Sequence, residues 1–254
     1  MNLDGSVAVR FDQVSKSIGT TRILEDVSFE VSRGTACSIL GRRGTGKTTV
    51  LKLAIGLLKP DRGRIFINGE EITALDTPDL MRVRRSTGFV FQNSAAFDSI
   101  AVSENIALPL RYNSSKPENE IQEKVLQLLI RVGLERDSHK MPVDLSVGMR
   151  KLLGFARALA CDPAILLLDD PWNGVDSITA AIIRRLLLDL KQRCRTTLLI
   201  VANKMIDVRH ISDQLAILDG GHMVACGPLN EVARCDNQIM RQFVSQEDSD
   251  ARLS

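Results

Sequence analysis

The segment GRRGTGKT, residues 41–48, decides how the chain folds, because it fits the pattern G-x-x-x-x-G-K-[ST] in the context that the pattern requires. An apolar run at residues 36–40 precedes it as a buried strand would, and TVLKLAIGL follows it as a helix. A strand, a glycine-rich loop and a helix in this order gather backbone N–H groups and the positive end of a helix dipole around an anion. The segment therefore predicts a phosphate-binding loop.

The side chains of this loop have separate expected roles. Lys47 supplies a point charge for the β- and γ-phosphates, and the Thr48 hydroxyl is placed to bind Mg²⁺. Arg42 and Arg43 are interpreted as solvated, variable positions rather than extra phosphate ligands. The alternative is a glycine-rich turn that happens to carry a lysine. The candidate nucleotide-binding stretch as a whole is Gly41, Arg42, Arg43, Gly44, Thr45, Gly46, Lys47, Thr48 and Thr49.

A second segment, ILLLDDPWNGVD at residues 165–176, ends an apolar run in two adjacent acids. An Mg²⁺ ion held by a hydroxyl and by phosphates needs a carboxylate from a neighbouring strand, usually through water. Asp169 is the candidate for that carboxylate, and the alternative is an aspartate that only caps the next turn. The two segments together predict a nucleoside triphosphatase.

Composition narrows the class of protein. The chain has 254 residues, of which 44% are hydrophobic, so it can bury a large core in one domain or in one domain with an insertion. Its 33 basic and 31 acidic residues give a net charge of +2, too balanced to indicate a nucleic-acid partner. No apolar stretch approaches the roughly 20 residues that cross a bilayer, and the five cysteines form no CxxC pair. We expect a cytosolic protein without a His or Cys metal site.

The hydrophobic pattern changes along the chain. Residues 7–40 alternate as strands, residues 102–159 are mainly helical, and strand and helix alternate again from residue 164. This order predicts a parallel α/β core with a helical insertion. We expect a domain at residues 7–238, with the insertion at about 93–160, and a polar tail at 239–254.

Four further segments complete a pattern: FVFQN with Gln92, LSVGMRK from Leu145, DDPWNGVD, and TTLLIVANK. In this order and spacing, over residues 7–238, the sequence resembles the ATP-binding subunit of an ABC transporter. The resemblance implies an α/β fold of the ABC-type P-loop NTPase, with a RecA-like parallel-sheet core, an antiparallel β subdomain and an inserted helical subdomain. It also implies ATP and Mg²⁺ as cofactors.

The resemblance assigns roles to individual residues. Gln92, in the family's Q loop, contacts Mg²⁺ or the attacking water and relays nucleotide state to a transmembrane partner. Ser146 and Gly148 belong to the signature motif, which reaches across a dimer interface to the γ-phosphate, and Ser146 suits a helix N-cap. Asp176 falls in the D-loop. The candidate metal ligands are therefore Thr48, Gln92 and Asp169.

Two departures from the family pattern concern the chemical step. Asp170 stands where the family has glutamate, and it is one methylene shorter, so its carboxylate is expected to fall short of the attacking water. Asn203 replaces the switch histidine and carries no titratable proton. Because general-base help is worth ~10²–10⁴ in rate, hydrolysis would slow while nucleotide binding persists. The alternative is that a small backbone adjustment brings Asp170 forward. The candidate catalytic residues are Lys47, Gln92, Asp170 and Asn203.

Other departures concern binding surfaces. Val147 stands where the signature has glycine, and a β-branched residue cannot readily adopt a positive φ, so the approach to phosphate is expected to be altered. Met149 replaces the usual glutamine. Ile18 takes the position of the aromatic residue that stacks on adenine. Trp172, the only tryptophan, is expected to pack at a dimer interface.

Within the family, residues 91–111 and 141–149 look most like the ATPases of the Mla and Mce systems, which move phospholipids or other hydrophobic molecules. That likeness implies transmembrane permease subunits, a second ATPase subunit and a lipid-binding partner, with the chain at the cytoplasmic face of the inner membrane. Amino-acid and lipoprotein transporters have related ATPases. One alternative is a degenerate nucleotide-binding module that acts by ATP-dependent dimerisation beside a competent ATPase. Another is a soluble ABC protein acting on DNA or ribosomes, but the chain has no room for the usual coiled-coil insertion or tandem domain.

Overall fold

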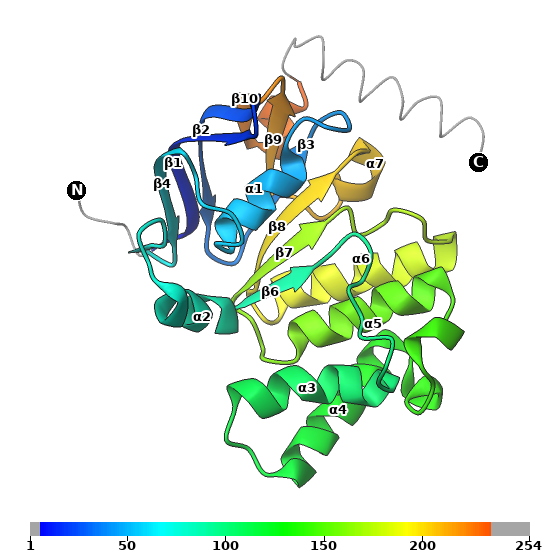
Figure 1. The fold of residues 1–254 in the computed structure, drawn as a ribbon. Helices are drawn as coiled ribbons and strands as arrows, with labels where there is room; N and C mark the ends of the chain where they lie inside the picture. Colours follow the sequence, from blue (N-terminus) through cyan, green and yellow to red (C-terminus); the bar gives the residue numbers. More distant parts are fainter. Residues whose placement is uncertain (1–5, 235–254) are drawn as a thin grey trace.

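The computed structural model describes residues 6–234 and contains two sheets (Figure 1). The smaller sheet is antiparallel in the order β2-β1-β4-β5. Its alternating apolar positions face one side, as expected for a sheet with one buried face. Its strands are β1 (Val7–Ile18), β2 (Thr21–Ser32), β4 (Arg62–Ile67) and β5 (Glu70–Glu71).

The larger sheet has six strands in the order β10-β9-β3-β8-β7-β6. The pairs from β9 to β6 are parallel, as predicted. Strand β10 is antiparallel to β9, because the turn at Gly220 and Gly221 is too short for the crossover that a parallel pair needs. The strands are β3 (Ala36–Leu40), β6 (Thr87–Val90), β7 (Ile165–Asp169), β8 (Thr197–Ala202), β9 (Gln214–Asp219) and β10 (His222–Pro228).

Helices cover both faces of this sheet. Helix α1 (Lys47–Ala54) lies between the two sheets, and α5 (Val147–Leu159) and α6 (Ser177–Gln192) lie on the other face (Figure 1). Between β6 and β7, where the helical insertion is predicted, the chain forms α3, α4 and α5 with two short 3₁₀ turns. The remaining helices are α2 (Thr77–Arg85), α3 (Val102–Asn113), α4 (Glu118–Val132), η1 (Glu135–Asp137), η2 (Pro142–Asp144), α7 (Met205–Val208) and α8 (Leu229–Val232).

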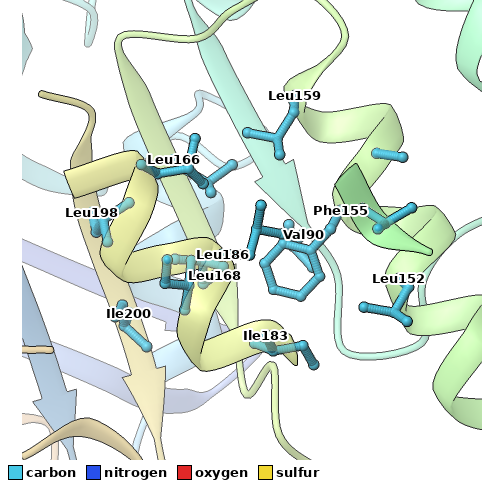
Figure 2. Packing of buried hydrophobic residues seen from close by; sticks show 14 of the residues in the cluster. Val90, Leu152, Phe155, Leu159, Leu166, Leu168, Ile183, Leu186, Leu198 and Ile200 are labelled. Atoms are coloured by element: carbon cyan, nitrogen blue, oxygen red, sulfur yellow. The ribbon is translucent and has the colours of Figure 1, made fainter. Parts of the chain in front are cut away.

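The central strands are buried on both faces, so they read as continuous apolar runs. In β7, Leu166 and Leu168 pack against α5 and α6, as Figure 2 shows, whereas Ile165 and Leu167 pack toward α1 and the small sheet. Phe155 of α5 is fully buried in the first of these clusters. The sheet is therefore packed against other elements on both faces. This packing fixes the loops at its strand ends relative to one another.

Strands β3, β6, β7 and β8 run parallel, so their carboxyl ends share one edge of the sheet. This is the edge at which open α/β sheets bind ligands. The residues that follow these strands are Gly41, Gln92, Asp170 and Asn203. The tail predicted at 239–254 and the last predicted domain residues, 235–238, lie outside the described residues.

Candidate nucleotide site

A cavity of about 460 Å³ opens at this edge of the sheet. It collects residues from five separate segments, including the predicted phosphate loop and both adjacent acids. The signature and D-loop candidates do not line it. Its lining residues are Ile23, Arg43, Gly44, Gly46, Lys47, Thr48, Thr49, Gln92, Asp169, Asp170, Asn173, Val201 and Asn203.

The phosphate loop depends on glycine at three positions. Gly44 and Gly46 have φ of 82° and 98°, in the region that favours glycine. A Cβ on Gly41 would lie 2.4 Å from the carbonyl oxygen of Leu218 on the neighbouring strand. At Gly44 and Gly46, which line the cavity, the backbone is therefore not covered by a side chain. Exposed backbone N–H groups of this kind suit the binding of phosphate oxygens.

Lys47 is 8% exposed and begins helix α1. Its Nζ donates to the carbonyl oxygens of Gly41 at 2.6 Å and Arg42 at 2.8 Å. Burial lowers the pKa of Lys47, and the negative charges of Asp170 and Asp169 oppose that change. The ammonium group is thus held within the loop and close to both acids.

The Thr48 hydroxyl and Asp169 form a second contact. Thr48 Oγ1 donates to Asp169 Oδ1 at 3.0 Å, joining the start of α1 to the end of β7. Burial raises the pKa of Asp169, while the Thr48 hydrogen bond and three lysines lower it. Residues 6–234 contain no cluster of three His, Cys, Asp or Glu residues that could hold a metal alone. One hydroxyl and one carboxylate are hard oxygen donors that suit Mg²⁺ when phosphates supply further ligands.

Asp170 is held differently. It follows β7 with φ of 47°, and its Oδ2 accepts a hydrogen bond from Asn203 Nδ2 at 2.5 Å. Burial raises the pKa of Asp170, and the hydrogen bond from Asn203 lowers it. The two positions that depart from the family pattern therefore contact each other directly.

The signature and D-loop residues lie at helix N-termini. Ser146 caps α5, where its Oγ accepts from the backbone N–H of Met149 at 3.2 Å, and Asp176 caps α6 through Thr179. A Cβ on Gly148 would lie 2.5 Å from Thr179 Oγ1, so this glycine lets the two helix starts pack. These residues form one cluster, separate from the cavity described above.

The structure corrects two expectations. Val147 is the first residue of α5 and is not among the residues with positive φ, so no backbone strain results there. Its side chain is instead 54% exposed at the helix start. Trp172 is 6% exposed and packs in the chain's own core with α5 and α6, so the interface expectation was wrong.

The remaining predicted positions fall as follows. Ile18 lies at the β1–β2 hairpin and is 55% exposed, while Ile23 lines the cavity. Arg42 and Arg43 are exposed, and Arg43 also lines the cavity. Sequence reasoning missed Ile23, Asn173 and Val201, because none of these residues carries a chemical signal in its local sequence.

A phosphate loop, adjacent strand-end acids and an inserted helical region on a mixed sheet define an ABC-type P-loop NTPase. The chain belongs to the ABC transporter family, whose model, described as "ABC transporter", matches residues 24–173. It is an ATP-binding subunit of an ABC transporter, and the domains of this family bind ATP with Mg²⁺ and hydrolyse it.

Curated relatives match over most of the chain. The probable ribonucleotide transport ATP-binding protein mkl of Mycobacterium leprae is 38% identical over 239 residues, covering 94% of this chain and 69% of the relative. The methionine import ATP-binding protein MetN of Cereibacter sphaeroides is 35% identical over 244 residues, with the same two coverages, 94% and 69%.

Solved structures match the fold. A dimeric, post-hydrolysis state of the ATP-binding cassette MJ0796 bound to ADP and Pi has a TM-score of 0.82 and 30% identity, covering 87% of this chain and 98% of that chain. The structure of cbiO1 from Clostridium perfringens, part of the ABC transporter complex cbiONQ, has a TM-score of 0.81 and 26% identity and covers 98% of both chains. Within residues 6–234, no helix is long and apolar enough to cross a membrane.

Proposed function

We propose that this subunit hydrolyses Mg-ATP between two ATPase subunits and thereby powers a permease that moves phospholipid or another hydrophobic substrate. The observation that carries the proposal is the cavity that joins Lys47 and Thr48 to Asp169 and Asp170. It offers a cation and backbone N–H groups for phosphates, and oxygen ligands for Mg²⁺.

The chain's residues divide the work. Lys47 binds the β- and γ-phosphates, and the backbone of Gly44 and Gly46 approaches them without side chains. Thr48, Asp169 and Gln92 would hold the metal ion, which when bound would neutralise phosphate charge.

Two other side chains activate the attacking water. Asp170 accepts a proton from the attacking water, and Asn203 orients that carboxylate through its 2.5 Å hydrogen bond. Both residues lie at strand ends of the same rigid sheet, so the acceptor is positioned before nucleotide binds.

A second subunit completes the site. Ser146 and Gly148 do not line the cavity of their own chain, yet the N-terminus of α5 is suited to an anion. Pairing two copies, or a copy and a related chain, brings each signature motif to the other subunit's nucleotide. The dimeric state of the cassette at TM-score 0.82 supports this arrangement.

The cargo assignment rests on residues 91–111 and 141–149, which resemble the Mla and Mce ATPases. The partners are then transmembrane permease subunits and a lipid-binding protein, with this chain at the cytoplasmic face of the inner membrane. The relatives are named for ribonucleotide transport and methionine import, and these are the competing cargoes.

The test is ATP hydrolysis by the complex purified with its permease. We expect turnover above that of a Lys47→Ala complex, and stimulation by phospholipid but not by a ribonucleotide or methionine. Turnover equal to the Lys47→Ala control would contradict the ATPase assignment. Stimulation by one of the polar solutes instead of phospholipid would overturn the cargo.

A second candidate is a module that binds ATP and hydrolyses it slowly, and the contact between Asp170 and Asn203 favours it. The hydrogen bond from Asn203 occupies one carboxylate oxygen of Asp170 and ties this short side chain to the residue that follows β8. The carboxylate would therefore extend less far into the cavity than that of a glutamate. This module would act through ATP-dependent dimer closure.

Replacing Asp170 by glutamate separates the two candidates. For an attenuated site we expect Asp170→Glu to raise kcat by at least about 10-fold and by no more than the ~10⁴-fold upper limit of general-base help, with ATP affinity unchanged. The measurement is steady-state hydrolysis with ATP binding by calorimetry. A fall in kcat would identify an enzyme adapted to aspartate.

A further inference from the structure

A lysine is buried beside the catalytic acids on the helix that carries the signature motif. Lys151 of α5 is 3% exposed, and the residues that follow it on the helix, Leu152 to Ala156, are all buried and none is charged. A lysine is almost never fully buried unless it is paired. A residue that only filled space here would be apolar, so the charge requires partners.

The Q loop supplies one partner. Lys151 Nζ donates to the backbone carbonyl oxygen of Gln92 at 2.5 Å, although the two residues are 59 positions apart. Lys151 also lines a second cavity, of about 410 Å³, with Gln92 and Asn173. Both of those residues line the nucleotide cavity as well, so Lys151 stands where the two cavities meet.

The adjacent acids act on the charge of this lysine. Burial lowers the pKa of Lys151, and the negative charges of Asp170 and Asp169 oppose that change. Burial raises the pKa of Asp170, and among the lysines that counter the rise Lys151 acts more strongly than Lys47 of the phosphate loop. The order of these two lysines is the same for Asp169.

We propose that Lys151 is a positioning residue of the ATPase site, which fixes the backbone of Gln92 and with it the Q loop. The inference deepens the proposed function and rests on hydrolysis at this site. Lys151 lies five residues after Ser146, about 7.5 Å along the same helix. Docking of the signature end of α5 on a second subunit's nucleotide would therefore move Lys151, and with it the Q loop of its own site.

The test uses the complex with its permease and four variants. Lys151→Met removes charge and hydrogen bond, Lys151→Gln keeps a donor without the charge, and Lys151→Arg keeps both. Lys191→Met is the matched control, because Lys191 Nζ also donates to a backbone carbonyl, that of Ile211 at 2.7 Å, and pairs with an aspartate away from the site. The readouts are kcat, ATP Kd and melting temperature of the complex, and the emission of Trp172 in the full chain purified without the permease, where it is the only tryptophan and lies two residues after Asp170.

We expect Lys151→Met to lower kcat by about 10- to 100-fold, the range that a misplacement of about 1 Å can cost, with ATP Kd changed by less than about 3-fold. Lys151→Gln should fall between Lys151→Met and wild type, and Lys151→Arg should recover most of the rate. The Mg-ATP-induced change in Trp172 emission should be lost in Lys151→Met and kept in Lys191→Met. A variant that does not fold is replaced in the comparison by Lys151→Gln.

Two outcomes overturn the inference. One is a Lys151→Met variant with the kcat and Trp172 response of wild type. The other is a loss of kcat that Lys191→Met reproduces at an equal drop in melting temperature, since that loss would report packing alone. If the wild-type complex hydrolyses no more than Lys47→Ala, the proposed function fails instead, and the Trp172 response alone decides the role of Lys151.

Discussion

Asp169 and Asp170 are adjacent in the chain, but each carboxylate is held by a different neighbouring side chain. Thr48 of the phosphate loop donates to Asp169, and Asn203 after β8 donates to Asp170. The backbone at Asp170 is left-handed, with φ of 47°. In the proposed function these two identical residue types would serve a metal ion and a water molecule, and their hydrogen-bond partners distinguish them.

Gly41 tests how closely the phosphate loop is packed. A Cβ there would lie 2.4 Å from the Leu218 carbonyl oxygen and 2.7 Å from Thr45 Oγ1, and the first of these is backbone that cannot swing aside. We expect Gly41→Ala to lower the free energy of unfolding by about 1–3 kcal/mol and to weaken ATP binding, because the loop must shift. Denaturant unfolding and calorimetric ATP titration measure both effects.

Gly227→Ala is the control for this substitution. Its added Cβ would meet Val232 Cγ2 at 3.5 Å, an ordinary contact, and its φ is not positive. We expect it to leave ATP affinity unchanged. Equal behaviour of the two variants would mean that the loop at Gly41 adapts at no cost.

At the scale of elements, helix α5 links three parts of the site. Its first turn carries the signature motif, its second turn carries Lys151, and its buried face packs on β6 and β7 (Figure 2). The Ser146 cap fixes the N-terminus of this helix and also points backbone N–H groups outward.

Substitutions at Ser146 can separate the cap from the anion site. We expect Ser146→Ala to cost about 1 kcal/mol of stability because the N-cap is lost. Ser146→Asp keeps the cap and the stability, but its negative charge should repel the γ-phosphate and abolish ATP-dependent dimerisation. Ser146→Asn should retain both properties. Thermal unfolding and light scattering with ATP measure the two effects, and a stable, dimerising Ser146→Asp variant would contradict the assignment.

Helices α3 and α4 are joined by an ion pair of Arg111. Arg111 near the end of α3 donates to Glu118 at the start of α4 at 2.5 Å and to Glu104 at 2.6 Å. The hydrogen bond from Arg111, followed by that from Gln122, lowers the pKa of Glu118 from 4.5 to about 2. A lowered folded-state pKa means that the contribution to stability is complete above pH 4.5 and is lost as pH falls toward about 2.

We therefore expect wild type to melt above Glu118→Gln at pH 6, and the difference to shrink below pH 4.5. Melting temperatures measured stepwise from pH 6 to pH 3 check this. Glu120→Gln on the same helix is the control, and salt should reduce the difference because the pair is exposed. A difference that stays constant with pH would show that Glu118 acts by packing.

Sequence predicted the elements better than the contacts between them. The strand, loop and helix around Gly41 and the strand that ends at Asp169 carry local signals in residue type and spacing. The contact between Lys151 and Gln92 spans 59 positions, and its geometry depends on how α5 is rotated against the sheet. Val147 was misjudged because a helix can begin at that residue without positive φ, and Trp172 because the core beneath the loop is built from α5 and α6.

At the scale of the molecule, one chain holds two incomplete halves of a nucleotide site. The phosphate loop, the candidate metal ligands and both adjacent acids line one cavity, while Ser146, Gly148 and Asp176 cluster at the starts of α5 and α6. The starts of α5 and α6 also carry exposed apolar side chains, with Val147 54% and Ile178 74% exposed. Charged phosphate on one half and helix N-termini on the other are complementary, which favours pairing only when nucleotide is bound.

This complementarity predicts an ATP-dependent change of mass. With hydrolysis blocked by Asp170→Asn, which keeps the side-chain shape, Mg-ATP should convert the 28.0 kDa chain to a species of about twice that mass, and ADP should not. Asp170→Asn combined with Lys47→Ala should stay monomeric at the same ATP concentration, because the γ-phosphate would lose its cation. Light scattering at several protein concentrations measures the equilibrium. If dimers form equally well without nucleotide, the exposed apolar residues and not the phosphate drive dimerisation. If the chain stays monomeric under all conditions, a different chain must supply the second half of the site.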